Sequence, residues 1–300
     1  MKILITGASG FIGSHIAKGL VQDKYTVCLL LRKTSNLRLI ESIKKSCGLF
    51  YYDGTYQSLE KTLQESKCQI VIHCASLFLS SHAPDDVECL MNSNISFPSM
   101  LLEAMANTGV QGFINTGTSW QHYRNEDYNP VNLYASTKQA FEQIISYYLE
   151  TGKIKQVTLK LFDTYGPDDS RRKLIPLLVN NLSSGERVNM SPGEQEVSIV
   201  HVEDVVDAYR LAINEVLNIN VGESLTFGVG SGKVYKLKEL IEDINNSFEN
   251  GRSINVFFGG RPYREREVMT VWDKYEAVPG WKESKNIIDF FKSYIKSKYD

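Results

Sequence analysis

The sequence predicts an α/β fold with a doubly wound parallel sheet and a smaller C-terminal lobe, on three observations. A short apolar run at residues 3–5 leads directly into Gly7, Gly10 and Gly13, which are spaced three apart, and then into a helical pattern. Apolar runs and helical patterns keep alternating to about residue 165. Beyond that point the pattern loosens into mixed short elements. We therefore expect a Rossmann-type sheet with a second lobe over its mouth.

The glycine-rich turn predicts a dinucleotide site. Gly7 allows a sharp turn, Gly10 lets the backbone approach a pyrophosphate, and Gly13 lets the helix pack closely on the strand. The start of that helix offers free N–H groups and partial positive charge to phosphates. The alternative is a glycine turn without a ligand. The cofactor-binding candidates here are Gly7, Ser9, Gly10, Phe11, Ile12 and Gly13.

The end of the second strand, expected at 26–31, favours NADP(H) over NAD(H). In this fold an acidic residue at that place binds the ribose 2′-hydroxyl of NAD, whereas a basic residue accepts the 2′-phosphate of NADP. This chain has Arg32 and Lys33 and no acid there. The alternative is a solvated surface cluster.

Further strands are expected at 49–52, 70–76 and 112–116, and three residues near them are cofactor candidates. Asp53 is placed to meet the adenine amino group, or else caps the next turn. Ala75 is a small residue at a strand end, where the backbone passes close to a ligand. Asn94 is a buried amide that needs partners and pins the loops above the cofactor. The other elements that the pattern predicts are helices over 37–45, 87–107, 133–150, 172–184 and 202–214, a strand over 156–162 and an extended piece over 196–201.

A reactive group is predicted where Thr118 ends a strand and Tyr134 and Lys138 follow on a helix. Residues four apart on a helix share one face, so the phenol and the ammonium point into the same site. A nearby Lys⁺ and a cationic nicotinamide are expected to lower the pKa of Tyr134 and make it an acid–base catalyst.

Composition excludes several classes of partner. The net charge of −2 gives no reason to expect nucleic acid or an acidic membrane surface. A first strand starting at residue 2 leaves no room for a targeting peptide, and no apolar run is long enough for a bilayer, so we expect a cytoplasmic protein. The five cysteines show no Cys-x-x-Cys pair and the five histidines no paired spacing, so no metal is expected.

Together these motifs resemble the extended short-chain dehydrogenase/reductases of the nucleotide-sugar epimerase/dehydratase family. The resemblance rests on the three glycines, Thr118, Tyr134, Lys138 and the segment 160–167, Lys-Leu-Phe-Asp-Thr-Tyr-Gly-Pro, and it covers nearly the whole chain. Within the family, the chain is most similar to the nucleotide-sugar 4-ketoreductases of the CDP-abequose and CDP-paratose synthase type.

The resemblance implies a role for each matched residue. Tyr134 protonates the C4 oxygen as hydride arrives, Lys138 holds the nicotinamide ribose, and Thr118 hydrogen-bonds the reacting oxygen. Arg264 grips the substrate pyrophosphate. The resemblance adds Phe162 to the cofactor-binding candidates, and the substrate-binding candidates are Ser76, Ser119, Trp120, Tyr134, Asp163, Lys173, Gln195 and Arg264.

Departures from the family pattern disfavour two reactions. Dehydratases carry Asp-Glu after the Thr, where this chain has Ser119 and Trp120. Epimerase-reductases of the GDP-fucose type use a Cys and a His, where this chain has Trp120 and Lys173. An expected Asn is Asp163 and an expected Arg is Val197, so the nucleotide base and the hexose stay open.

The function expected from these residues is NADPH-dependent reduction of the C4 ketone of a nucleoside-diphosphate-linked 4-keto-6-deoxy or 3,6-dideoxy sugar, in O-antigen or other deoxysugar biosynthesis. The alternatives are an NAD-dependent nucleotide-sugar 4-epimerase and a non-catalytic dinucleotide-sensing regulator. The resemblance also implies a homodimer paired through the helices at 87–107 and 133–150. The expected domains are a dinucleotide-binding domain over 1–165, with 199–227 packing back on it, and a substrate-binding lobe over 166–198 and 228–300.

Overall fold

A seven-stranded parallel sheet forms the centre of the molecule. The computed structural model describes residues 1–248 and 251–299. The strands are β1 (Lys2–Thr6), β2 (Thr26–Arg32), β3 (Gly48–Tyr52), β4 (Ile70–His73), β5 (Gly112–Thr118), β6 (Lys155–Leu161) and β11 (Ser224–Val229). Their order is β11-β6-β5-β4-β1-β2-β3, and all neighbours are parallel. The order reverses between β1 and β4, which is the place where doubly wound sheets bind ligands.

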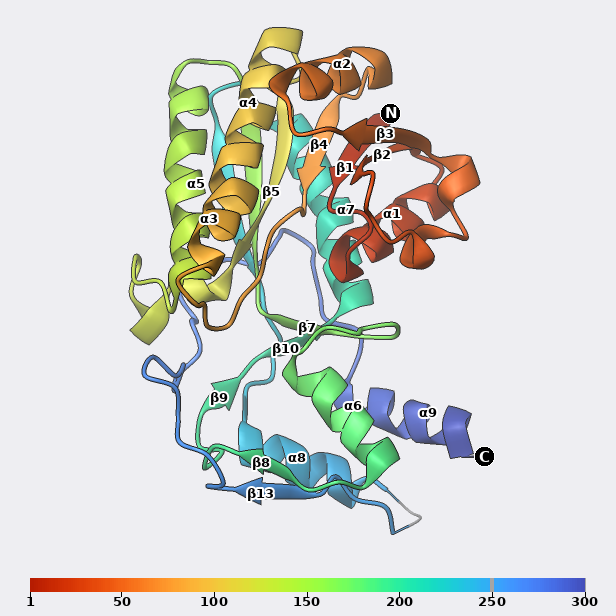
Figure 1. Cartoon of the computed structure of the whole chain (residues 1–300), viewed down its shortest axis with the longest axis vertical. Helices are drawn as coiled ribbons and strands as arrows, with labels where there is room; N and C mark the ends of the chain where they lie inside the picture. The colour runs from red at the N-terminus through yellow and green to blue at the C-terminus, as the bar shows by residue number, and fades with distance from the viewer. Residues whose placement is uncertain (249–250, 300) are drawn as a thin grey trace.

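Helices cover both faces of this sheet (Figure 1). Helices α1 (Phe11–Gln22) and α7 (Val202–Asn218) pack on one face, and α2 (Tyr56–Ser66), α4 (Phe97–Thr108) and α5 (Leu133–Glu150) pack on the other. Each face buries its own apolar cluster, because the central strands are apolar on both sides. The predicted fold class, a Rossmann-type doubly wound sheet, is confirmed.

A third apolar cluster lies beyond one end of the sheet (Figure 1). It is built by α6 (Leu174–Ser184), α8 (Leu237–Asn246) and α9 (Ile287–Tyr299). The short strands around it are β7 (Asp163–Tyr165), β8 (Val188–Met190), β9 (Glu196–Val197), β10 (Ile199–His201), β12 (Tyr235–Lys236) and β13 (Val256–Phe258). Between them the chain returns to the sheet through α7 and β11.

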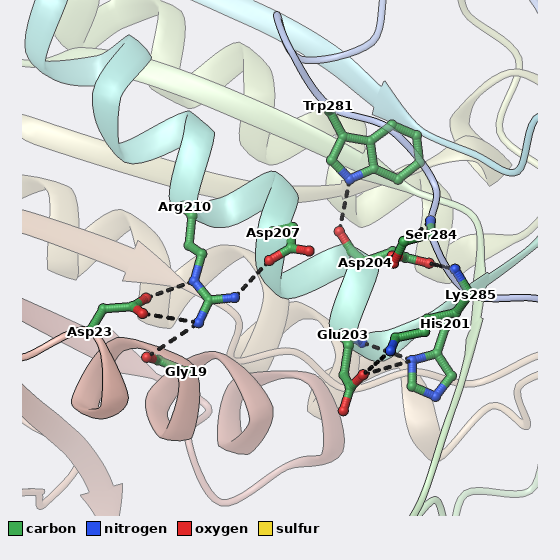
Figure 2. Close-up of polar contacts among 10 residues, drawn as sticks. All are labelled: Gly19, Asp23, His201, Glu203, Asp204, Asp207, Arg210, Trp281, Ser284 and Lys285. Carbon is green, nitrogen blue, oxygen red and sulfur yellow. Dashed lines mark hydrogen bonds and ion pairs between the residues drawn. The ribbon is translucent and has the colours of Figure 1, made fainter.

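Polar contacts join α7 to α1 and to the segment that precedes α9 (Figure 2). Arg210 pairs with Asp23 at the end of α1, with nitrogen to oxygen distances of 2.6 and 3.2 Å. In the first turn of α7, the fully buried Asp204 accepts hydrogen bonds from Ser284 and from the Lys285 backbone, at 2.6 to 3.1 Å. Trp281 donates to the Asp204 carbonyl at 2.8 Å. These bonds anchor the segment that precedes α9 to helix α7.

The structure corrects several predicted elements. The segment 37–45 forms two 3₁₀ turns, Arg38–Ile40 and Lys44–Ser46, because so short a helix has little stability without packing and only Ile40 is buried there. The helix expected at 87–107 is interrupted, since a π-helical segment, Asn92–Ser96, separates α3 (Asp86–Met91) from α4. Strand β4 ends at His73, short of 76, and α7 runs on to Asn218, past 214.

Among the described residues, no helix is both long enough and apolar enough to cross a lipid bilayer.

Candidate active site and cofactor cleft

The glycine turn after β1 is shaped by two steric constraints. Gly7 has a φ of +71°, and a Cβ added to it would lie 2.5 Å from the Ala75 nitrogen. A Cβ on Gly13 would lie 2.4 Å from the Gly7 carbonyl oxygen, so helix and turn touch backbone to backbone. Gly10 is different, because its Cβ would meet only the Gly7 oxygen, at 3.3 Å. The space beside Gly10 is therefore open, as a cradle for a pyrophosphate requires.

The adenosine end of a bound dinucleotide would meet the ends of β2 and β3. Arg32 is paired in register with Tyr52, so Arg32 and Asp53 lie at the same edge of the sheet. Arg32 is exposed and makes no ion pair with another described residue, and Lys33 is also exposed. Asp53 is engaged in a turn, where it accepts hydrogen bonds from the Thr55 backbone and hydroxyl at 2.9 and 2.6 Å. Asp53 thus caps the turn that holds Thr55, the N-cap of α2, and this role accounts for Asp53 without an adenine contact.

A cavity of about 560 Å³ runs from the glycine turn to the predicted reactive group. It is lined by the turn and by Thr118, Tyr134 and Lys138, which come from β5 and α5. Asn132 caps α5 by accepting from the Ala135 backbone at 3.0 Å, and its amide donates to the carbonyls of Leu79 and Ser80. This cap fixes the first turn of α5, which carries Tyr134, against the loop that follows β4.

Burial sets the charge states of the pair on α5. It raises the pKa of Tyr134 to about 12, although the Ser76 hydroxyl and Arg171 act in the opposite direction. It lowers the pKa of Lys138 to about 8, against the opposing effects of Cys74 and Glu142. The expected lowering of the Tyr134 pKa is thus wrong for the protein alone, because desolvation of a phenolate outweighs nearby positive charge. At neutral pH Tyr134 is a neutral proton donor.

A second cavity, of about 580 Å³, adjoins the first. The two share lining residues that include Trp120, Phe162, Asp163 and Lys173. The second cavity is rich in cations, with Arg171, Arg172, Lys173, Arg261, Arg264 and Arg266 along its walls. A cleft with this charge fits an anionic ligand such as a diphosphate.

Asp163, Lys173 and Trp120 form the junction of the two cavities. Lys173 donates to Asp163 at 2.8 Å and lies 4.4 Å above the Phe78 ring and 5.9 Å from the Trp120 ring centre. Burial alone would raise the pKa of Asp163, but Lys173, Arg171 and Arg264 together hold it below its usual value. The structure thus places Trp120 and Lys173 side by side, where the resemblance aligned them with a Cys and a His.

The carboxylates that line the cavities are engaged in protein contacts. Asp163 is paired with Lys173, as described above. Glu196 accepts from the Val271 backbone at 3.0 Å, and Glu267 accepts from the Arg264 backbone at 3.3 Å. Among the described residues, this leaves no carboxylate pair poised beside Thr118 as acid and base.

The remaining candidates divide into residues that line the cavities and residues that do not. Phe11, Ile12, Ser76 and Ser119 line the first cavity, and Gln195 and Arg264 line the second. Ser9, Arg32, Lys33, Asp53, Ala75 and Asn94 line neither. Asn94 lies behind the wall, where it bonds to both backbone groups of Leu77 and to the Thr137 hydroxyl, as expected of a residue that pins the loop.

Sequence reasoning missed several residues of the site, among them Phe78 and Arg171. Phe78 packs edge-on against Tyr134, with ring centres 5.0 Å apart, and also contacts Trp120 at 5.6 Å. Arg171 lies 4.3 Å above the Phe11 ring and pairs with Asp169. The only signal was an aromatic residue in a loop of small residues for Phe78, and a run of three basic residues, 171–173, for Arg171.

Known proteins resemble this chain in sequence and in fold. A CDP-abequose synthase from Yersinia pseudotuberculosis is 27% identical over 99% of both chains, and a UDP-glucose 4-epimerase from Lactobacillus helveticus is 23% identical over 96% of this chain and 94% of its own. The solved UDP-glucose-4-epimerase from Stenotrophomonas maltophila, with bound NAD, superposes with a TM-score of 0.84 at 22% identity, covering 99% of this chain and 97% of that one. The sequence model of the NAD-dependent epimerase/dehydratase family matches residues 3–230. The protein is therefore a member of the NAD-dependent epimerase/dehydratase family of enzymes.

Proposed function

We propose that this enzyme uses NADPH to reduce the C4 ketone of a nucleoside-diphosphate-linked 4-keto-6-deoxy or 3,6-dideoxy sugar. The observation that carries the proposal is the continuity of the cleft. Thr118, Tyr134 and Lys138 line the same cavity as the glycine turn, and this cavity adjoins the cationic one. The resemblance to CDP-abequose synthase over the full chain agrees with a nucleotide-sugar substrate.

Each residue of the site has a distinct role in the proposed reaction. NADPH, when bound, supplies the hydride. Tyr134 donates its proton to the C4 oxygen, and Thr118, which also lines this cavity, hydrogen-bonds the same oxygen. Lys138 holds the nicotinamide ribose. Arg264, on the cationic wall, binds the substrate pyrophosphate.

The site favours reduction over dehydration and over a sensor without chemistry. Tyr134, protonated at neutral pH in the cofactor-free protein, can supply the proton that reduction of a ketone requires. In the part of the chain that the structure describes, the engaged carboxylates and the Trp120 side chain leave no acid–base pair for dehydration. A non-catalytic sensor would have no need of Thr118, Tyr134 and Lys138 together in one cavity.

The preference for NADP(H) rests on Arg32. Its exposed guanidinium stands at the end of β2 without an ion-pair partner among the described residues, so it is available to a 2′-phosphate. An enzyme that exchanges its reductant in each turnover is suited to NADPH. The rival 4-epimerase would retain NAD, and the solved epimerase from Stenotrophomonas maltophila does hold bound NAD.

The test is the decay of NADPH absorbance, with NADH in parallel, against CDP-, dTDP-, GDP- and UDP-linked 4-keto-6-deoxy sugars. Rapid oxidation with one donor supports the reductase and identifies the nucleotide. A lack of oxidation with every donor, together with NAD bound in the purified protein, would replace the reductase by the 4-epimerase.

Two structural proposals accompany this function. The chain divides into a dinucleotide-binding part, 1–165 with 199–227, and a substrate-binding lobe, 166–198 with 228–300. Two copies pair through the face of α4 and α5, where Tyr147 is 62% exposed. If the purified enzyme sediments as a monomer, the proposal of a dimer is wrong.

A further inference from the structure

Three polar side chains converge behind the end of β5, outside both cavities. Gln121 is fully buried, Lys160 is 6% exposed and Glu142 is largely covered. All three meet the backbone at Gly117, the residue before Thr118. A Cβ there would lie 3.0 Å from the Gln121 oxygen, 3.0 Å from Lys160 Cγ and 3.2 Å from Glu142 Oε1. We call these three residues the β5 cluster.

The β5 cluster is bonded to the backbone of Thr118. Glu142 Oε1 accepts from the Gln121 amide at 2.9 Å, and Glu142 Oε2 lies 3.4 Å from Lys160 Nζ. The amide oxygen of Gln121 accepts from the Thr118 N–H at 3.0 Å. The position of Thr118 is therefore held by Gln121, whose amide nitrogen is held in turn by Glu142 and, at 2.8 Å, by Gln139 Oε1.

Glu142 also lies one helical turn beyond Lys138 on α5, so both side chains lie on the same face of that helix. Lys138 is buried and makes no hydrogen bond or ion pair with any described residue. Burial opposes its charge, whereas Cys74 and, to a smaller extent, Glu142 favour it. The other titratable groups around Lys138 are Tyr134 on its own helix and His73 at the end of β4.

Lys160 has a second partner, His122, which lines the second cavity. It donates to His122 Nε2 at 2.9 Å, while His122 Nδ1 lies 3.1 Å from the Glu126 carbonyl oxygen that accepts its proton. The His122 ring stacks on Trp272, with ring centres 3.9 Å apart, and both rings line the second cavity. Lys160 thus joins Glu142 to His122 and, through the stacked Trp272 ring, to the wall of the second cavity.

We propose that Glu142 is a positioning residue of the active site, which keeps Lys138 in its charged form and, through Gln121, holds Thr118 in place. Glu142 lines neither cavity and touches no reacting atom. What the site does with Lys138 and Thr118 rests on the proposed function.

The test is the pH dependence of kcat/KM in Glu142→Gln, which keeps the shape of the side chain and removes its charge. If Lys138 must be charged, activity is lost as pH rises through the Lys138 pKa, about 8 in this structure. Removing a negative charge one helical turn away lowers that pKa, so the alkaline limb should move to lower pH by about one unit. Glu142→Asp keeps the negative charge, so its alkaline limb should lie at the same pH as that of the wild-type enzyme. Glu150→Gln, on the exposed end of α5, is the matched control and should leave the limb in place.

Lys160→Met provides the opposite perturbation and an independent variant should Glu142→Gln fail to fold. Loss of that positive charge should move the limb to higher pH. A limb that stays in place in both variants, or moves equally in Glu150→Gln, would overturn the proposal.

A readout without turnover separates this proposal from the proposed function. The dissociation constant of NADPH, followed by its fluorescence across pH, reports the charge of Lys138 through the cofactor alone. If the wild-type enzyme reduces no donor sugar, the reductase assignment fails, while the same shift in binding between wild type and Glu142→Gln would still support the role of Glu142. No shift in binding would reject that role.

Discussion

Alanine at Gly10 and at Gly13 should separate cofactor binding from folding. At Gly10 the φ is −85° and the new Cβ meets only the Gly7 oxygen, at 3.3 Å, so Gly10→Ala should change the free energy of unfolding by less than about 1 kcal/mol. The methyl group would stand where the pyrophosphate approaches the start of α1. Weakening one charged hydrogen bond costs about 1.5–3 kcal/mol, so NADPH affinity should fall about 10- to 100-fold.

At Gly13 the same methyl group would lie 2.4 Å from the Gly7 oxygen and 2.8 Å from the Gly7 carbonyl carbon. Backbone cannot yield as a side chain does, so Gly13→Ala should lower the free energy of unfolding by about 1–3 kcal/mol or more, as overpacking does. Urea denaturation and NADPH fluorescence titration measure both quantities in both variants. Wild-type NADPH affinity in Gly10→Ala would refute the cofactor cradle, and equal losses of stability in the two variants would refute the steric distinction between them.

Three further substitutions test the chemistry, the cofactor and the fold. Tyr134→Phe should lower turnover by about two orders of magnitude or more while NADPH still binds, because it removes the general acid; retained turnover would exclude Tyr134 from that role. Arg32→Ala should weaken NADPH about tenfold or more and NADH far less, as measured by KM for each; equal losses would show that Arg32 does not contact the 2′-phosphate. Asp204→Asn replaces a buried carboxylate that accepts three hydrogen bonds by a group with its own N–H donors, so thermal unfolding should show a loss of about 2 kcal/mol. An unchanged midpoint would mean that Asp204 does not anchor the chain before α9.

The elements best predicted from sequence are those with local signals at both ends. Helix α5 runs from Leu133 to Glu150 as expected, because Asn132 supplies a cap and the apolar spacing is continuous. The segment 37–45 has apolar residues at similar spacing and yet is not helical. It is short, and tertiary packing, which the spacing does not reveal, buries only part of it.

In the candidate site, too, the features predicted from sequence are those with local sequence signals. The glycine turn and the Tyr134–Lys138 pair are local patterns, and both line one cavity. Phe78 and the β5 cluster depend on contacts between segments far apart in sequence, such as Gln121 with Glu142 and Glu142 with Lys160. Spacing alone carries no information about such contacts. The pKa of Tyr134 escapes sequence reasoning for a related reason, since desolvation depends on everything packed around the phenol.

The most direct test of the central claim follows the hydride itself. NADPH carrying deuterium at nicotinamide C4 would be incubated with the nucleotide-linked 4-keto-6-deoxy sugars, and the sugar product analysed by mass spectrometry and proton NMR. We predict one deuterium at sugar C4, with stoichiometric loss of NADPH. A product without deuterium at C4, or interconversion of C4 isomers with no net consumption of NADPH, would contradict the reductase and favour an epimerase with resident NAD.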